Sequence, residues 1–326
     1  MQLSILIATY NRAEVLRQTL EAMCEVEREC LDIEFVIIDN NSTDHTGEII
    51  GSFQNRLPIR HLFQPVQGKS AALNLALDNA PLGDIMVFTD DDIIPRKDWL
   101  AAIVTACNTY PNIGIFGGCV EVIWPASPPT WLFAPEVRFA LCAHDHGSDP
   151  VLYPETPYPS GSNYPTGANL WVRRELLSAT CRFTEELGVG HPAGLMGEDK
   201  QLTYALARQG HKILFYPRAI VGHRVDPKLL HKRNILSRAC RAGRAHIHTH
   251  LVPQQRLTSH ITPLKLARVS LAAVASFLLC SVLLPVALLN DRVFCRSVVR
   301  YWVLGYHRER FQIVYSAYVS GFRGSN

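Results

Sequence analysis

Acidic residues are almost absent from the last third of this chain. Residues 228–326 contain two Asp or Glu against 15 Lys or Arg, and residues 228–268 contain nine Lys or Arg and no acid. Residues 1–227 have the opposite balance, with 27 acidic residues against 17 basic ones. This change of charge predicts a boundary near Pro227, between an acidic domain over 1–227 and a basic tail over 228–326 with a different physical role.

Paired cysteine motifs are also missing. The nine cysteines include no Cys-x-x-Cys pair, so the sequence suggests neither a zinc ribbon nor a disulfide framework. They fit buried apolar side chains in a reducing compartment. The chain opens directly on a strand-like apolar run without a basic leader or a cleavage site, so we expect no signal peptide and a main domain that faces the cytoplasm.

Hydrophobic residues make up 48% of the 326 residues, enough for one large α/β domain with an appendage. Apolar runs typical of strands alternate with amphipathic helices of about ten residues, which predicts a doubly wound, Rossmann-like sheet of parallel strands. The expected strands are Leu3–Ala8, Phe35–Ile38, Ile59–Phe63, Ile85–Phe88, Leu170–Val172, Ile213–Tyr216 and Ala219–Val221. The expected helices are Ala13–Cys24, one capped by Ser42 or Asp44 that runs into Ile50, Ala71–Asn79, and one opened by Gly197 and ended by Gly210.

Three consecutive carboxylates follow the apolar run Ile85–Phe88. Asp90, Asp91 and Asp92 would repel one another unless a cation or hydrogen bonds neutralise them. Open α/β sheets bind ligands at the carboxyl ends of their strands, and Mg²⁺ or Mn²⁺ often binds through carboxylates together with substrate phosphates. The triplet therefore indicates a metal–diphosphate site, with a solvated acidic turn as the alternative.

The tail contains a charge-free run of 21 residues over 269–289. A bilayer span needs about 20 such residues, so membrane association is favoured. Lys265 and Arg268 precede the run and Arg292 follows it, so a single span would carry one positive flank across the membrane. A shallow or re-entrant insertion stays open, and the basic segment 228–250 suits the anionic lipids of a cytoplasmic leaflet.

Five segments, in order along the chain, resemble the motifs of the family 2 glycosyltransferases, which have a GT-A fold. Each is weak alone, and Gly68-Lys69-Ser70 lacks the upstream glycine of a P-loop; the order of all five makes the signal specific. The resemblance covers residues 1–225 and implies a GT-A catalytic domain over 1–227. The segments are Ser4–Arg12 (SILIATYNR), Ile37–Asp44 (IIDNNSTD), Gly68–Asn74 (GKSAALN), Asp90–Asp92 (DDD) and Gly197–Asp199 (GED).

The resemblance implies where a nucleotide-sugar donor would bind. Asp39 corresponds to the carboxylate that binds the nucleobase, with an N-cap or Asx turn as the alternative. Lys69 would approach the diphosphate as a point charge, or would be an exposed lysine at a helix start. The residues expected to line the nucleotide are Thr9, Tyr10, Asn11 and Arg12.

Asp90 and Asp92 occupy the two acidic positions of the family's Asp-x-Asp signature. The resemblance implies that Asp92 binds Mn²⁺ or Mg²⁺ and that Asp90 contacts the ribose or the metal. Asp91, between them, either joins these contacts or is only solvated. His223 is a candidate third metal ligand, which would favour Mn²⁺, or else a structural histidine. Such a metal would neutralise the charge that develops on the leaving diphosphate.

Asp199 matches the aspartate of the family's Glu-Asp signature and is the candidate general base for the acceptor hydroxyl. Glu198, Gly167 and Asn169 are candidate contacts to the acceptor or sugar, with an ordinary helix start and a turn as the alternatives. One aspartate base without a visible nucleophile implies direct displacement with inversion. No Gln-x-x-Arg-Trp signature of processive members follows, so we expect single additions.

His144-Asp145-His146 looks like a metal cluster, but we interpret it as loop or acceptor surface.

The predicted function is an inverting glycosyltransferase that moves one sugar from a nucleotide-sugar, first of all a UDP-sugar, to a lipid-linked or polysaccharide acceptor. It would be held by membrane lipids with its catalytic domain facing the cytoplasm, and no nucleic acid partner is expected. One rival is a non-catalytic nucleotide-sugar-binding or membrane scaffold protein, which would not need the base Asp199. The other is a sugar nucleotidyltransferase, which would need a glycine-rich loop that Thr9–Arg12 does not provide.

Overall fold

The computed structural model describes residues 1–125, 127–138, 141–154, 164–177, 181–191, 195–249 and 261–323. The chain divides into two compact units. The sheet unit consists of Met1–Trp124, Cys142–Gly194 and Glu198–Val225. The helical unit consists of Pro125–Leu141, Leu195–Gly197 and Asp226–Asn326.

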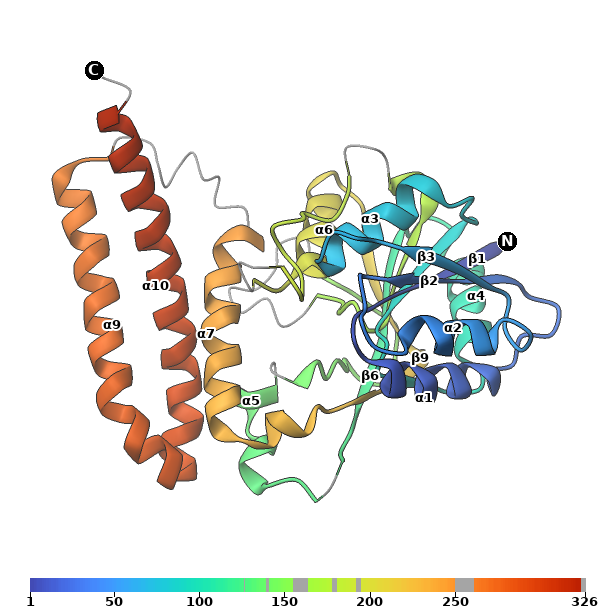
Figure 1. Ribbon diagram of the computed structural model, residues 1–326, viewed down its shortest axis with the longest axis horizontal. Helices are drawn as coiled ribbons and strands as arrows, with labels where there is room; N and C mark the ends of the chain where they lie inside the picture. The colour runs from blue at the N-terminus through green and yellow to red at the C-terminus, as the bar shows by residue number, and fades with distance from the viewer. Residues whose placement is uncertain are drawn as a thin grey trace. The chain divides into compact units, whose positions relative to one another are not determined.

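A mixed β-sheet forms the centre of the sheet unit (Figure 1). Its strands are β1 Gln2–Thr9, β2 Asp32–Asp39, β3 Ile59–Phe63, β4 Ile85–Thr89, β5 Ile93–Pro95, β6 Ile115–Ile123, β7 Val151–Leu152, β8 Leu170–Arg173 and β9 Ile213–Arg224. They are ordered β3-β2-β1-β4-β8-β6-β9-β5, and β7 pairs with β9 outside this path. Strands β1 to β4 are parallel to their neighbours in this set, as the alternation of strands and helices predicts.

The second half of the sheet departs from the predicted parallel pattern. Strand β8 runs antiparallel to both β4 and β6, and β5 and β7 run antiparallel to β9. The two short strands expected on either side of Pro217 form one long strand, β9. The register between β6 and β9 shifts between Gly118 and Cys119, where β9 bulges around Pro217. A bulge is one of the places where a strand tolerates proline, which cannot donate to the ladder.

The helices of the sheet unit are α1 Ala13–Cys24, α2 Thr46–Phe53, α3 Lys69–Asn79, α4 Trp99–Thr109 and α6 Glu198–Arg208. Four of them agree closely with the predicted ranges, whereas α4 was not predicted. The capping prediction for α2 is wrong for Ser42, whose Oγ accepts from the Asn11 N–H at 2.9 Å instead. His45 is the N-cap residue, while Asp44 Oδ1 accepts from the Thr46 N–H at 3.0 Å. Gly210, after α6, has the positive φ of 92° expected of a glycine that ends a helix.

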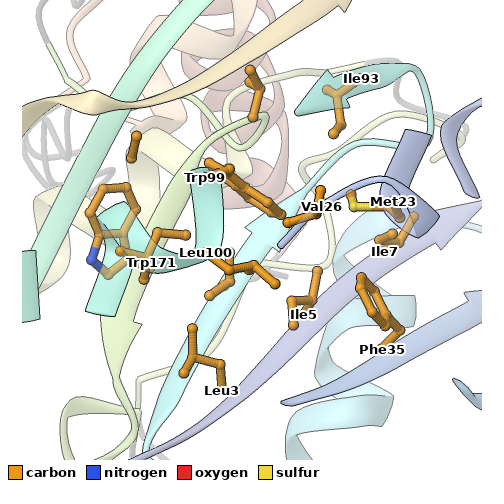
Figure 2. Close-up of a cluster of buried hydrophobic side chains, with 14 of the residues drawn as sticks. Leu3, Ile5, Ile7, Met23, Val26, Phe35, Ile93, Trp99, Leu100 and Trp171 are labelled. Carbon is orange, nitrogen blue, oxygen red and sulfur yellow. The ribbon is translucent and has the colours of Figure 1, made fainter. Parts of the chain in front are cut away.

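Apolar side chains cover both faces of the sheet because its central strands are buried on both sides. Figure 2 shows the cluster on one face, in which Leu3, Ile5 and Ile7 of β1 lie with Phe35, Trp99 and other buried side chains. Residues of α1, α2 and α4 complete this cluster. Residues of α3 and α6 form a second cluster with the alternate side chains of the same strands, such as Leu6 and Val36. The sheet is thus held rigidly between two helical layers.

The helical unit contains three long helices, α7 Lys232–Thr249, α9 Pro263–Leu289 and α10 Asp291–Arg323, together with α5 Pro135–Arg138 and the short 3-10 helices η1 Thr130–Phe133 and η4 Pro227–Leu230. Within this unit α9 and α10 lie side by side as an antiparallel pair, and α7 lies along α10 (Figure 1). His250, the last residue of the predicted basic segment, lies outside the described residues. Among the described helices, α9 is the one whose length and composition would let it cross a membrane.

All nine cysteines lie in the described ranges and are free thiols. The expectation that they are buried is wrong for Cys30, which is exposed.

Candidate active site

The carboxyl ends of β1, β2 and β4 meet at one edge of the sheet. Thr9 is paired in register with Asp39 of β2, and Ile7 with Thr89 of β4. The loop after β1 and the acidic triplet after β4 therefore lie next to each other. This is the edge at which the sequence predicts a ligand site.

Asp91 joins the acidic triplet to the loop after β1. Its carboxylate accepts from Thr9 Oγ1 at 2.7 Å and forms an ion pair with Arg12. The Asp91 residue is 4% exposed, so the alternative of a solvated acidic turn is wrong. Burial raises the pKa of Asp91 to about 6, although the neighbouring charge of Arg12 opposes this shift. Arg12 also pairs with Asp92 at 2.8 Å, and one guanidinium thus neutralises two carboxylates.

Asp90, Asp92 and His223 are brought together by two strands. Strand β5 follows the triplet and pairs with β9, which sets Ile93 opposite His223. One ligand atom from each of the three residues lies within 4.8 Å of the others. His223 Nε2 lies 3.2 Å from Asp92 Oδ1 and 3.9 Å from Asp90 Oδ2. Burial lowers the pKa of His223, but the interaction with Asp92 outweighs it and raises the pKa to about 9. His223 and Arg12 together hold the pKa of Asp92 below its ordinary range, against the effect of burial.

The residues of this cluster fit a divalent cation. Asp92 Oδ1 is buried; His223 Nε2 lies 3.2 Å away as an ion-pair partner, but no described residue gives this oxygen a well-aligned hydrogen bond. A buried carboxylate oxygen without a well-aligned donor is costly unless a cation compensates it. Two carboxylates and an imidazole form a donor set that Mn²⁺ accepts well, whereas Mg²⁺ prefers oxygen ligands alone.

Lys69, at the start of α3, lies among acidic side chains. Its Nζ forms an ion pair with Asp90 and lies 3.5 Å from Glu198 Oε1. Its side chain is 17% exposed, so the alternative of an exposed lysine is wrong. Burial lowers the pKa of Lys69, but Asp90 and Glu198 outweigh it and keep the pKa above its ordinary value. Burial raises the pKa of Glu198, and Lys69 opposes that shift. Lys69 therefore stays a cation at this edge.

Asp199, in the first turn of α6, is held by two backbone donors. Its Oδ2 accepts from the Gly167 N–H at 2.6 Å, and its Oδ1 accepts from the Lys200 N–H at 2.7 Å. A Cβ built on Gly167 would lie 3.3 Å from Lys69 Nζ and 3.5 Å from Asp199 Oδ2. The absence of a side chain at Gly167 thus lets a lysine and a carboxylate approach the same backbone point.

Asp39 and the loop after β1 are fixed by short-range hydrogen bonds. Asp39 Oδ1 accepts from the Ser42 N–H at 2.9 Å, which is an Asx-type contact. Asn11 has a φ of 50°, and its Oδ1 accepts from the Thr43 N–H at 2.7 Å. Tyr10, which precedes Asn11, is exposed. Contacts of Asp39 and of this loop to a nucleotide stay predictions.

Asn169 lies inside the sheet rather than at its surface. It is 1% exposed, its Nδ2 donates to Cys119 O and Ala219 O at 2.9 Å, and its Oδ1 accepts from Trp99 Nε1 at 3.0 Å. The side chain therefore joins β6, β9 and α4. A direct contact between Asn169 and a sugar stays a prediction.

His144 is a buried structural residue. It is 3% exposed, its backbone pairs with Val120, and its Nε2 hydrogen-bonds to the Tyr153 hydroxyl. Burial lowers its pKa to about 3, so the ring is neutral. The interpretation of His144-Asp145-His146 as loop or acceptor surface is therefore wrong for His144.

Known proteins share this domain. Residues 4–145 match the family model described as Glycosyl transferase family 2. The probable glycosyltransferase YdaM of Bacillus subtilis is 26% identical over 224 residues, which are 67% of this chain and 50% of that protein. The validoxylamine A glucosyltransferase of Streptomyces hygroscopicus subsp. jinggangensis is 32% identical over 130 residues, which are 39% of this chain and 30% of that protein.

Solved structures give the fold. A mannosyltransferase from Pyrobaculum calidifontis, solved in complex with GDP-Man and Mn²⁺, has a TM-score of 0.58 at 19% identity and covers 94% of this chain and 86% of its own. The structure of TarS 1–349 from S. aureus in complex with UDP has a TM-score of 0.52 at 15% identity and covers 98% of this chain and 92% of its own.

The mixed sheet and these structural matches define a GT-A fold. Over residues 4–145, which are less than half of the chain, the sequence is similar to family 2 of the glycosyltransferases. The chain matches about half the length of YdaM and a smaller share of the validoxylamine A glucosyltransferase.

Proposed function

We propose that the protein is an inverting glycosyltransferase that moves a single sugar from a nucleotide-sugar to a hydroxyl of a lipid-linked or polysaccharide acceptor. The observation that carries this proposal is the arrangement of Lys69. Its Nζ pairs with Asp90 of the metal-ligand cluster, and it reaches the same backbone point, Gly167, as the Asp199 carboxylate. Charges suited to a diphosphate and a base suited to a hydroxyl thus lie at one edge of the sheet.

Asp90, Asp92 and His223 would hold Mn²⁺ or Mg²⁺. When bound, this ion supplies Lewis-acid stabilisation of the negative charge on the leaving diphosphate. Lys69 adds a second positive charge on the same side. Arg12 acts through Asp91 and Asp92, because its ion pairs fix the carboxylates from the side of β1.

Asp199 is the proposed general base. It takes the proton of the acceptor hydroxyl while that oxygen forms a bond to the anomeric carbon, and the bond from this carbon to the diphosphate oxygen breaks. The N–H groups of Gly167 and Lys200 fix the orientation of the carboxylate, so less freedom is lost when the acceptor binds. Attack on the face opposite the leaving group inverts the anomeric centre.

The nucleotide is proposed to lie along the loop after β1, with its base near Asp39 and with UDP as the nucleotide tried first. The nucleotide of the donor has to be determined by experiment, since solved structures of the same fold contain GDP-Man in one case and UDP in another. The Thr9–Arg12 loop is tied to Asp91 from one side and to residues 42–43 from the other. This loop would therefore be ordered before the donor binds.

The acceptor class and the location are proposed from the tail. The division into a catalytic domain over 1–227 and a membrane-associated tail over 228–326 would hold the enzyme at a bilayer, where lipid-linked substrates are concentrated. The catalytic domain would face the cytoplasm, where nucleotide-sugars are made. The apolar helix α9 supports this placement.

Donor turnover by the full chain tests the function. The protein in detergent, with Mn²⁺ and membrane lipid extract as acceptor, is offered a panel of nucleotide-sugars, and the release of nucleoside diphosphate is measured. We expect turnover of one donor, its loss on chelation, and a fall of kcat by about 10²- to 10⁴-fold in Asp199→Asn with little change in donor binding. Glu186→Gln, at an exposed position, is the matched control.

The anomeric configuration of the product, read by NMR, tests inversion separately. A β-linked product from an α-linked donor supports the mechanism, and a retained configuration contradicts it. Donor binding without any turnover, in wild type and Glu186→Gln alike, would favour a non-catalytic nucleotide-sugar-binding protein.

A further inference from the structure

Helix α9 leaves one long apolar face uncovered in the helical unit. Six exposed large apolar side chains follow one another at intervals of three, four or seven residues, which places them on one side of a helix. Those that define this face are Leu264, Leu271, Val274, Leu278, Val282 and Leu289. Val282 is 73% exposed and Leu289 89% exposed. An uncovered apolar patch of this length marks an interaction surface.

The opposite face of α9 is covered by protein. Val269, Cys280 and Ala287 are buried. The Tyr301 hydroxyl of α10 donates to Cys280 O at 3.3 Å. At the C-terminal end of α9, Lys232 Nζ of α7 donates to Ala287 O at 3.3 Å. Helix α9 is therefore fixed to its neighbours along one side and open along the other.

The contact between Tyr301 and Cys280 places the arginines that lie near Tyr301 in α10 beside the middle of α9. Cys280 lies about 16 Å along the helix axis from Val269, at 1.5 Å per residue, and so near the centre of the charge-free run 269–289. Arg300 precedes Tyr301, and Arg296 lies one turn away; both are exposed. Neither has an ion pair with any residue in the described ranges.

A transmembrane position of α9 would carry these arginines into the bilayer. If α9 crossed the membrane, Cys280 would lie near the midplane, and Arg300 with it. Charged side chains at that depth are costly and almost always face a protein interior or a water-filled cavity, whereas Arg296 and Arg300 are exposed. The length and composition of α9 allow a span, but its packing against α10 opposes one.

We infer that α9 lies in the plane of a single leaflet, with its open face inserted at the boundary between headgroups and acyl chains. The partner is the surface of an anionic lipid bilayer. Arg268 lies on the inserted side near one end of α9, and Arg292 follows its other end. Basic side chains around an inserted apolar face bind anionic headgroups. The helical unit is then a one-sided anchor, and this inference rests on the proposed membrane association but not on glycosyl transfer.

Vesicle flotation with the full chain tests the surface. Purified protein is mixed with vesicles of phosphatidylcholine alone or with phosphatidylglycerol added. We expect flotation that is stronger with phosphatidylglycerol and weakened by salt, and a loss of about tenfold or more in vesicle binding for Val282→Asp. Gln312→Asp, at an exposed position of α10, adds the same charge outside this face and should float like wild type.

Two outcomes would overturn the lipid surface as the partner. One is flotation of Val282→Asp equal to that of Gln312→Asp. The other is a wild-type dimer, seen by analytical ultracentrifugation in the absence of lipid, that is dissociated by Val282→Asp while vesicle flotation stays unchanged. In that case the open face of α9 would bind a second copy of the chain. Circular dichroism and donor turnover in detergent show whether Val282→Asp is folded.

Thiol labelling on sealed vesicles distinguishes an in-plane helix from a span. Cys30 is exposed in the sheet unit and reports the side on which that unit lies. Arg292→Cys adds a second exposed thiol, in the first turn of α10 next to the end of α9. We expect a membrane-impermeant maleimide to label both positions from the same side. Labelling of Cys30 alone, with the substituted position reacting only after detergent, would show that α9 spans the membrane. Each result is independent of catalysis.

Discussion

His223 Nε2 lies 3.2 Å from Asp92 Oδ1, and both side chains are largely buried. The imidazolium compensates the charge of a carboxylate whose Oδ1 receives no well-aligned hydrogen bond from the described residues. A divalent cation would replace the proton on the imidazole and take over that compensation. Protonation of His223 and metal binding are thus alternative ways to neutralise Asp92.

We expect Asp92→Asn to abolish metal-dependent activity. The amide removes a charge from the cluster of Asp90, Asp92 and His223, so Mn²⁺ affinity should fall by about 10- to 100-fold or more. Chelation followed by Mn²⁺ should restore the wild type and not the variant. Calorimetric titration measures the affinity, and Asp98→Asn, at an exposed position, is the control. Equal Mn²⁺ affinity in Asp92→Asn and wild type would contradict the proposed ligand set.

We expect Lys69→Gln to weaken donor use. A hydrogen bond to a charged group contributes about 1.5–3 kcal/mol, so kcat/KM for the donor should fall by about 10- to 100-fold. The variant also leaves Asp90 and Glu198 without their common cation, so its stability should fall as well. Lys97→Gln, at an exposed position, removes the same charge and should change neither quantity. Initial rates and urea unfolding separate the two effects.

The metal-free protein should lose stability as the pH rises from 6.5 to 9.5. The pKa of His223 is raised to about 9 in the folded state, against about 6.5 in an unfolded chain. The stabilisation is therefore fully present below pH 6.5 and is lost as the pH passes through 9, up to about 3 kcal/mol. Urea unfolding in the presence of a chelator measures this loss. His223→Gln should remove the loss, and an equal loss in that variant would show that another group causes it.

Two glycines should be indispensable to the helical unit. A Cβ at Gly243 of α7 would lie 1.8 Å from Trp302 O, and a Cβ at Gly305 of α10 would lie 1.9 Å from Cys240 O. Since these contacts involve backbone on both sides, Gly243→Ala and Gly305→Ala should each destabilise the protein by about 2 kcal/mol or more. Gly51→Ala in α2 meets nothing within 4 Å and should stabilise it by about 0.5–1 kcal/mol. Thermal unfolding ranks the three variants.

The first half of the sheet was predictable because its signal is local. Each of β1 to β4 is a short apolar run followed by a polar turn, and parallel pairing brings those turns to one edge. The antiparallel half depends on strand directions that no local pattern specifies, such as that of β8, which pairs Ile85 with Arg173. Pro217 suggested a break between two strands, whereas the bulge absorbs it. The periodicity of apolar residues within one segment indicates neither the direction in which a strand pairs nor the bulge at Pro217.

The site was predicted as a set of residues but not as a network. The motifs identified Arg12 only as part of a loop that lines the nucleotide. Its ion pairs with Asp91 and Asp92 follow from the adjacency of β1 and β4. The sequence did contain a signal for these ion pairs. The loop after β1 contains Arg12, the loop after β4 contains three aspartates, and neighbouring parallel strands bring two such loops together. The sequence contained no comparable signal for Asn169, since an asparagine that is buried in the core and one that binds a ligand look the same in a sequence.

The pairing of β5 with β9 orders events in a nascent chain. Strand β9 leaves the ribosome after every other strand of the sheet unit, and it brings His223 opposite Ile93 only when it docks. Until then Asp90 to Asp92 have emerged without their imidazole partner. Because domains fold as units during synthesis, the metal-ligand set becomes complete in the same step that closes the sheet. A chain interrupted before residue 213 has the acidic triplet but cannot assemble the centre that the triplet serves.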